Sequence, residues 1–88
     1  MNGSDEIVFG RDPDQTNHTF RHTDALGLHR SDVIDAIRDD LRSYLPLQSP
    51  PPNSSPFIGR VIVGGIELRY HAYPISQGLV NVGRITRP

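Results

Sequence analysis

A pair of glycines at 64–65 separates two runs in which apolar and polar residues alternate. Such alternation is typical of strands that bury one face, and a two-residue Gly-Gly connection favours a primed hairpin turn. Because that turn fixes the register, Val61 should pair with Leu68 on one face and Arg60 with Arg69 on the other. We therefore expect an antiparallel hairpin with one buried and one exposed face.

The alternation resumes after this hairpin, so residues 79–86 predict a third strand that follows a turn over 74–78. A five-residue loop often carries a bulge, which leaves the register of this strand open by one residue. Residues 7–9 are the other short apolar run and could add a fourth strand. We expect an antiparallel sheet of three to four strands in the C-terminal part of the chain.

A helix is expected from Ser31, whose hydroxyl can cap the first free N–H groups, to Pro46, which cannot continue a helix. The segment 46–56 contains five prolines and predicts an irregular, stiff connection. The apolar residues between 31 and 46 recur at helical spacing and form one stripe, which we expect to pack on the sheet. They are Val33, Ile34, Ile37, Leu41, Tyr44 and Leu45.

The sequence before Ser31 is more polar. Residues 1–16 show no sustained period and predict a flexible arm, whereas 17–27 can be interpreted as a short helix capped by Asn17 and ended at Gly27. On that helix His18, Arg21 and His22 would share a face. An extended alternative would put His18, Phe20 and His22 on one side instead.

These elements predict one α+β domain over residues 17–88, with N-terminal helical segments packed on a C-terminal sheet. A chain of 88 residues without cysteine has neither a disulfide framework nor a thiolate site, and its apolar runs are too short to cross a membrane. Charge is divided unevenly, because residues 1–55 hold nine acids against five arginines while residues 56–88 hold four arginines against Glu67 alone. The sheet is thus predicted to be its basic part.

Two facing arginines repel each other unless an anion or a carboxylate lies between them, which makes Arg60 and Arg69 a candidate anion site. The exposed face should also carry His71 and Tyr73, and Tyr70 is a further candidate from this strand. Arginine can contact phosphate oxygens and aromatic rings can stack on bases, so these five residues are candidate substrate-binding residues. The alternative is that Glu67 and the acids of the N-terminal half simply neutralise the arginines.

His18, Arg21 and His22 form a second candidate group. Cleavage of RNA needs a base for the 2′-hydroxyl, an acid for the leaving oxygen and a cation for the phosphorane, and two imidazoles with a guanidinium could supply all three. A solvated helix face is the alternative interpretation. A zinc site at His18 and His22 is disfavoured because no third ligand is evident, and we predict no metal and no cofactor.

The order of these features resembles the C-terminal toxin domains of bacterial polymorphic toxins, including those of contact-dependent growth inhibition. The features are the run at 18–28 (His-Thr-Phe-Arg-His-Thr-Asp-Ala-Leu-Gly-Leu), a capped helix, a Pro-rich gap, a Gly-Gly hairpin and Asn-Val-Gly-Arg-Ile at 81–85. The resemblance covers residues 18–86. Many such domains are metal-independent ribonucleases of the barnase/EndoU/colicin/RelE superfamily. Two departures are the near-neutral charge of the whole chain and the small number of evident strands.

The resemblance implies His18, Arg21 and His22 on the helical side and Asn81, Arg84 and Thr86 on the sheet as functional residues. It makes His22 the first candidate for the general base or acid, Arg84 for phosphate stabilisation and Asn81 for substrate positioning. It further implies delivery from a secreted parent protein into the cytoplasm of a target bacterium, RNA as the substrate with tRNA as one candidate, and a cognate immunity protein. A non-enzymatic protein-binding module is the alternative, and a small regulator ranks last because no basic helix-turn-helix is evident.

Overall fold

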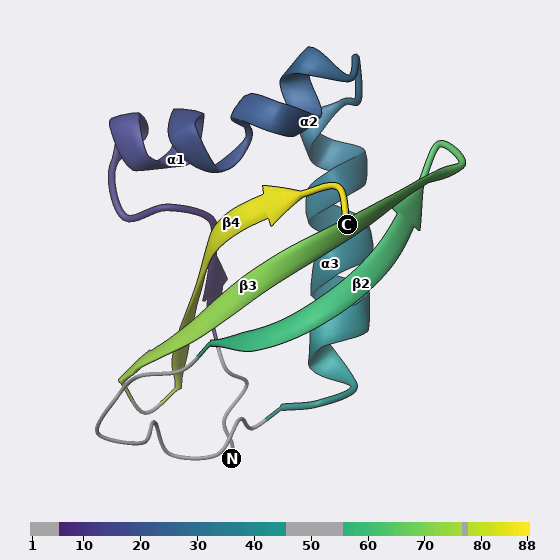
Figure 1. The fold of residues 1–88 in the computed structure, drawn as a ribbon. Coiled ribbons are helices and arrows are strands. Elements are labelled where there is room, and N and C mark those ends of the chain that lie inside the picture. The colour runs from purple at the N-terminus through teal and green to yellow at the C-terminus, as the bar shows by residue number, and fades with distance from the viewer. Residues whose placement is uncertain (1–5, 46–55, 77) are drawn as a thin grey trace.

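The computed structural model describes residues 6–45, 56–76 and 78–88, and these form a small α+β fold. Helices α1 (Pro13–Thr19), α2 (Arg21–Ala25) and α3 (Arg30–Arg42) precede most of the sheet. The strands are β1 (Glu6–Val8), β2 (Phe57–Val63), β3 (Ile66–Ser76) and β4 (Leu79–Thr86), arranged in the order β1-β4-β3-β2. Helix α3 covers one face of the sheet, α1 and α2 lie across one end of it, and no described helix covers the opposite face (Figure 1).

The hairpin confirms the prediction from the glycine pair. Val61 pairs with Leu68 and Arg60 with Arg69 in the antiparallel ladder of β2 and β3. Gly64 and Gly65 have φ angles of +58° and +79°, the left-handed values that a primed turn requires at both central positions. The local turn chemistry therefore decides which side chains of both strands face the core.

The third predicted strand is also confirmed, since β4 spans residues 79–86, but the turn before it is shorter than expected. Strand β3 continues through Pro74 to Ser76. Proline can lie in this strand because β2 begins at Phe57, which pairs with Ala72, so no β2 residue faces Pro74 across the ladder. The pairing of β3 with β4 shifts between His71 and Ala72, where Gly83 is left as a bulge.

The N-terminal segment differs from the predicted arm in its described part, residues 6–16. Strand β1 pairs in parallel with the start of β4, which makes the sheet mixed and gives it a fourth strand. Ile7 and Phe9 are only 3% and 7% exposed. Their burial in the core explains why this polar stretch is ordered, and residues 1–5 lie outside the described part of the chain.

The predicted helix over 17–27 is wrong in its start and in its continuity. Helix α1 begins at Pro13 and is capped by Asp12, whose carboxylate accepts a hydrogen bond from the backbone N–H of Gln15 at 2.8 Å. It ends at Phe20, which separates it from α2 and is 1% exposed. The Phe20 ring stacks on Phe9 with 5.7 Å between centroids, so anchoring of this side chain in the core coincides with the break.

The cap of helix α3 lies two residues earlier than predicted, at His29 rather than Ser31, and the helix runs from Arg30 to Arg42. Pro46, the expected stop, and most of the Pro-rich connection lie outside the described residues. Of the predicted apolar stripe, Val33, Ile37 and Leu41 are fully buried, but Tyr44 is 53% exposed. Tyr44 lies beyond the end of the helix, where its ring packs against Phe57 with 4.8 Å between centroids.

The core lies between α3 and the inner face of the sheet, where Leu68, Tyr70 and Ala72 of β3 are fully buried. Tyr70 passes over Gly59, where a Cβ atom would come within 2.4 Å of the tyrosine ring. Its hydroxyl donates a hydrogen bond to Asp40 of α3 at 2.6 Å. Burial and this carboxylate raise the pKa of Tyr70, so the phenol stays protonated and ties the helix to the sheet.

Candidate functional site

The uncovered face of the sheet gathers most of the polar residues predicted for the site. Register places Arg69 between Arg60 and Thr86, and it places His71 between Ile58 and Arg84. Tyr73 pairs with Asn81 farther along the same strands. We call this surface the outer face, and its predicted members are Arg60, Arg69, His71, Tyr73, Asn81, Arg84 and Thr86.

Tyr70 does not belong to the outer face. It is 0% exposed and points into the core, so its expected role in substrate binding is not supported. The reason is the period of a strand, which sends neighbouring side chains to opposite faces. The hairpin register had already put Tyr70 on the face of Leu68, and His71 on the face of Arg69.

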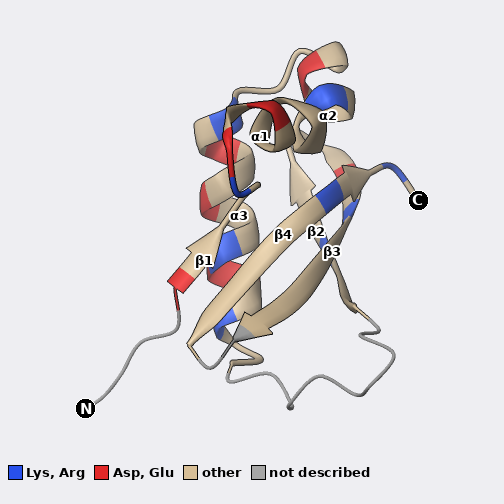
Figure 2. Ribbon diagram, turned by 90° about the vertical axis from the view of Figure 1, so that its left-hand side faces the viewer, with Lys and Arg blue, Asp and Glu red and all other residues tan. Residues whose placement is uncertain are grey.

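The outer face is basic, and few carboxylates pair with its arginines. Arg60 lies 3.5 Å from Glu67, and both side chains are about half exposed or more, so this contact is a weak one. Among the described residues no other ion pair involves an arginine of the sheet, and the buried Nε of Arg69 has no hydrogen-bond partner there. Neutralisation by the acids of the N-terminal half is therefore not what the described contacts show. Figure 2 shows acidic positions on α1 and α3 and arginines on the strands.

His71 is the titratable group at the centre of this surface. Partial burial lowers its pKa below the usual 6.5, and the positive charges of Arg84 and Arg69 lower it further. The Nδ1 atom of His71 is buried and has no hydrogen-bond partner among the described residues. The other ring nitrogen, Nε2, is not buried in this way. The ring is thus neutral at pH 7 and can meet a ligand through Nε2.

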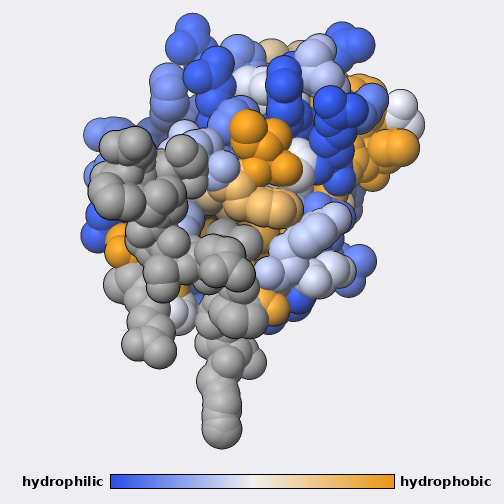
Figure 3. All heavy atoms as spheres, turned by 60° about the horizontal axis from the view of Figure 1, so that its bottom comes forward, coloured by the Kyte–Doolittle hydropathy of each residue, from blue (hydrophilic) through white to orange (hydrophobic). Residues whose placement is uncertain are grey.

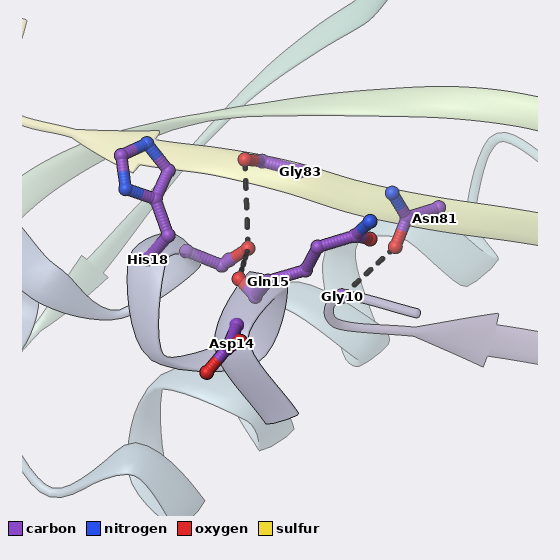
Figure 4. A pocket seen from close by; sticks show the side chains of 7 residues that line it. Gly10, Asp14, Gln15, His18, Asn81 and Gly83 are labelled. Carbon is purple, nitrogen blue, oxygen red and sulfur yellow. Dashed lines mark hydrogen bonds between the residues drawn. The ribbon is translucent and has the colours of Figure 1, made fainter. Parts of the chain in front are cut away.

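A pocket of about 340 Å³ lies between α1 and β4, at the edge of the outer face. It is lined by Gly10, Asp14, Gln15, His18, Thr19, Asn81 and Gly83. Figure 4 shows the His18 ring beside β4 and the Gln15 side chain reaching toward Asn81. One predicted residue from the helical side and one from the sheet, His18 and Asn81, therefore line the same cavity.

Gly83 connects this pocket with the outer face. A Cβ atom at Gly83 would lie 3.3 Å from a ring carbon of Tyr73 and 3.5 Å from Nδ2 of Asn81, which locates both side chains beside the bulge. The Thr19 hydroxyl, 3.5 Å from the Gly83 carbonyl oxygen, joins α1 to the same point. Tyr73 thus lies beside Gly83, a lining residue of the pocket, and follows His71 along the outer face.

Arg21 and His22, the other predicted residues of the helical side, are exposed on α2. Neither of them lines the pocket with His18. The break at Phe20 ends the helix on which the three were expected to share a face. His22, the first candidate for acid or base, therefore does not share the pocket that His18 and Asn81 line.

Sequence reasoning missed Asp14 and Gln15, because residues 1–16 were assigned to an arm. A signal for their helix was present in Asp12-Pro13-Asp14-Gln15, where Asp12 can cap, proline suits the first helical position and Gln15 stands three residues after the cap. Gly83 was missed as well, since the bulge depends on how β4 pairs with β3.

In comparisons with known proteins, no family model, curated protein or solved structure matched the chain. The resemblance to polymorphic toxin domains therefore stays a prediction. Within the described ranges, no three His, Asp or Glu side chains come together in a way that could hold a metal ion. No helix of that part of the chain is long and apolar enough to cross a membrane.

Proposed function

We propose that this domain is a metal-independent ribonuclease whose site is the outer face of the sheet. The observation that carries the proposal is the pairing of His71 with Arg84 across β3 and β4, on a surface where Glu67 is the one acid of residues 56–88. A neutral imidazole beside two guanidinium groups suits attack within a phosphodiester, since it can take a proton while the cations hold the phosphate.

The reaction would be an internal transesterification. His71 removes the proton of a ribose 2′-hydroxyl, the resulting oxygen attacks the adjacent phosphorus, and the bond to the 5′-oxygen of the next nucleotide breaks. Arg84 and Arg69 stabilise the charge that develops on the phosphorane oxygens. His18 is the second imidazole near these strands and is our candidate for the acid that protonates the leaving oxygen.

This assignment gives His71 the role that the resemblance had suggested for His22. Arg60 and Thr86 extend the phosphate-binding surface along the ladder from Arg69. Under the same proposal the domain acts as a toxin that is carried by a secreted parent protein into a competing bacterium, cleaves RNA such as tRNA in its cytoplasm and is blocked by an immunity protein in the producer.

The test is incubation of the purified domain with total RNA in the presence of a chelator, followed by mapping of the new ends. We expect discrete fragments from the wild type and at least a hundredfold slower cleavage by His71→Gln, in the range expected for loss of one acid or base group. His29→Gln, at the exposed cap of α3, serves as the matched control and should cleave normally. Equal cleavage by both variants, or no cleavage by the wild type, would contradict the proposal.

A protein-binding module is the second candidate, and exposed apolar side chains favour it. Ile58 and Ile62 of β2 are 51% and 70% exposed, and β2 is an edge strand. Apolar side chains also reach the surface in Figure 3. An exposed edge strand can accept a strand from a partner. Intact RNA together with tight binding of a partner that Ile62→Lys abolishes would support this function instead.

A further inference from the structure

Two side-chain amides of the pocket between α1 and β4 accept hydrogen bonds from the backbone, Asn81 at a part-buried position and Gln15 at an exposed one. Successive backbone N–H groups donate to their oxygens, Gly10 to Oδ1 of Asn81 at 2.9 Å and Arg11 to Oε1 of Gln15 at 3.0 Å. An amide whose oxygen is engaged in this way presents its NH₂ group elsewhere as a donor. Both Gln15 and Asn81 line the cavity, so the pocket offers two donor groups.

The loop that supplies these N–H groups has little freedom to rearrange. Gly10 has a φ angle of +89°, in the left-handed region, and a Cβ atom there would lie 2.4 Å from the backbone nitrogen of Thr16. The Thr16 hydroxyl also donates to the carbonyl of Phe9 at 2.7 Å. Because the backbone is held at this point, the orientation of the Asn81 amide is set before any ligand arrives.

We infer that this pocket binds a pyrimidine base of the RNA, an inference that rests on the proposed function in that RNA lies on the adjacent outer face. The hydrogen-bonding edges of uracil and cytosine each carry two acceptors and one donor. The two NH₂ groups of Gln15 and Asn81 match those two acceptors. The corresponding edge of adenine has a single ring-nitrogen acceptor next to an amino donor, and that of guanine has one acceptor and two donors.

The surroundings of the two amides suit a flat ring linked to a phosphate. Gly83 has no side chain to occupy the space beside Asn81, and the Tyr73 ring lies next to Gly83. The His18 imidazole stands at the other end of the cavity. Aromatic rings are the usual partners on which unpaired bases stack, which suits Tyr73, and His18 keeps its role as the candidate acid. A base held here would leave its phosphate toward the arginines of β3 and β4.

Binding of 2′-O-methyl hexanucleotides, whose blocked 2′-oxygen prevents cleavage, tests this inference apart from catalysis. We expect the uridine and cytidine hexamers to bind about tenfold more tightly than the adenosine hexamer, the scale of discrimination by one well-made donor pair. In ¹⁵N-correlated spectra they should also shift the side-chain NH₂ signals of Gln15 and Asn81. Equal affinity for all three, or unmoved NH₂ signals, would overturn the inference.

The decisive variant is Asn81→Asp, which keeps the oxygen that accepts from Gly10 but replaces the donor by an acceptor. We expect the preference for uridine over adenosine to disappear, whereas Asn17→Asp, an exposed position of α1 outside the pocket lining, should retain it. The ratio of affinities is the readout, because the added charge weakens binding of both hexamers alike. Retained preference in Asn81→Asp would contradict the inference. Cleavage of RNA without a preference for pyrimidines would contradict the pyrimidine pocket but not the ribonuclease. A preference for pyrimidines without cleavage would contradict the ribonuclease but not the pocket.

Discussion

The two faces of the sheet are built from alternate residues of the same strands, yet they differ in almost every physical property. On the inner face Leu68, Tyr70 and Ala72 are fully buried against α3. On the outer face Arg69 and His71 are partly exposed and positively charged or titratable. Inner-face and outer-face residues alternate along the same strand. Stability and chemistry can therefore be altered independently by substitutions at neighbouring positions.

The largest expected difference between the faces is in stability. Leu68→Ala removes a fully buried side chain and should lower the free energy of unfolding by about 2–5 kcal/mol. Ile62→Ala on the outer face of β2, where the side chain is 70% exposed, should change it by less than about 0.5 kcal/mol. Urea denaturation measures the free energy of unfolding of both variants. Similar losses of stability at the two positions would contradict the difference between the inner and the outer face.

A smaller effect is expected for the polar contact of the inner face. Tyr70→Phe removes the donor to Asp40 and leaves a half-buried carboxylate unpaired, at a cost of about 1–3 kcal/mol. Because the folded state holds the proton of Tyr70 more tightly than the unfolded chain, wild-type stability should fall as the pH rises above the unfolded pKa of about 10.

Tyr44→Phe, at a side chain that is 53% exposed, is the control for this contact and should change stability little. The alkaline loss of stability should be shallower in Tyr70→Phe than in the wild type. If denaturation curves at pH 8 and pH 11 show the same loss in both proteins, the hydrogen bond does not hold Tyr70 in its protonated form.

The sequence predicted the sheet far better than the helical region. The Gly-Gly turn sets the register of β2 and β3 through local backbone chemistry alone, so every pair of that ladder could be named in advance. Helices α1 and α2 are short, and their break depends on Phe20 entering a core that includes Phe9. The contact between Phe9 and Phe20 joins two separate segments of the chain. The pattern of apolar residues within either segment does not reveal it.

For the candidate site too, the part on the sheet was predictable from the sequence and the part that involves the N-terminal segment was not. Arg60, Arg69 and His71 share a face by register, and this was predictable. The pocket forms only because β1 pairs with β4 and brings Gly10 to Asn81, a contact between residues 71 positions apart. The polar composition of residues 1–16 concealed that pairing, and with it the helix that carries Gln15 and His18.

On the outer face, removal of one cation should weaken RNA binding without loss of stability. For Arg84→Gln we expect several-fold weaker binding of a 2′-O-methyl RNA and a salt dependence whose logarithmic slope is smaller by about 0.7, as for one lost phosphate contact on a single strand. Arg42→Gln removes the same charge from the end of α3 and is the control. Filter binding at several salt concentrations would show whether the slope changes only for Arg84.

The smallest expected effect is the pH dependence that His71 contributes to stability. Its pKa is lowered in the folded state, so below the unfolded value of 6.5 the unfolded chain binds more protons and stability falls as the pH falls. Between pH 7.5 and pH 5.5 the wild type should lose more stability than His71→Gln, by less than about 1 kcal/mol because the ring is partly exposed. Equal losses would mean that His71 has no lowered pKa.

The most direct test of the site is a map of where RNA binds. A mixed-sequence 2′-O-methyl RNA is titrated into ¹⁵N-labelled domain while the backbone amide signals are followed. If the outer face is the RNA site, the largest shifts will come from Arg69, His71 and Arg84, and the signals of Asp35 and Asp39 on α3 will not move. Largest shifts on α3, or around His22 on α2, would contradict the assignment of function to the outer face.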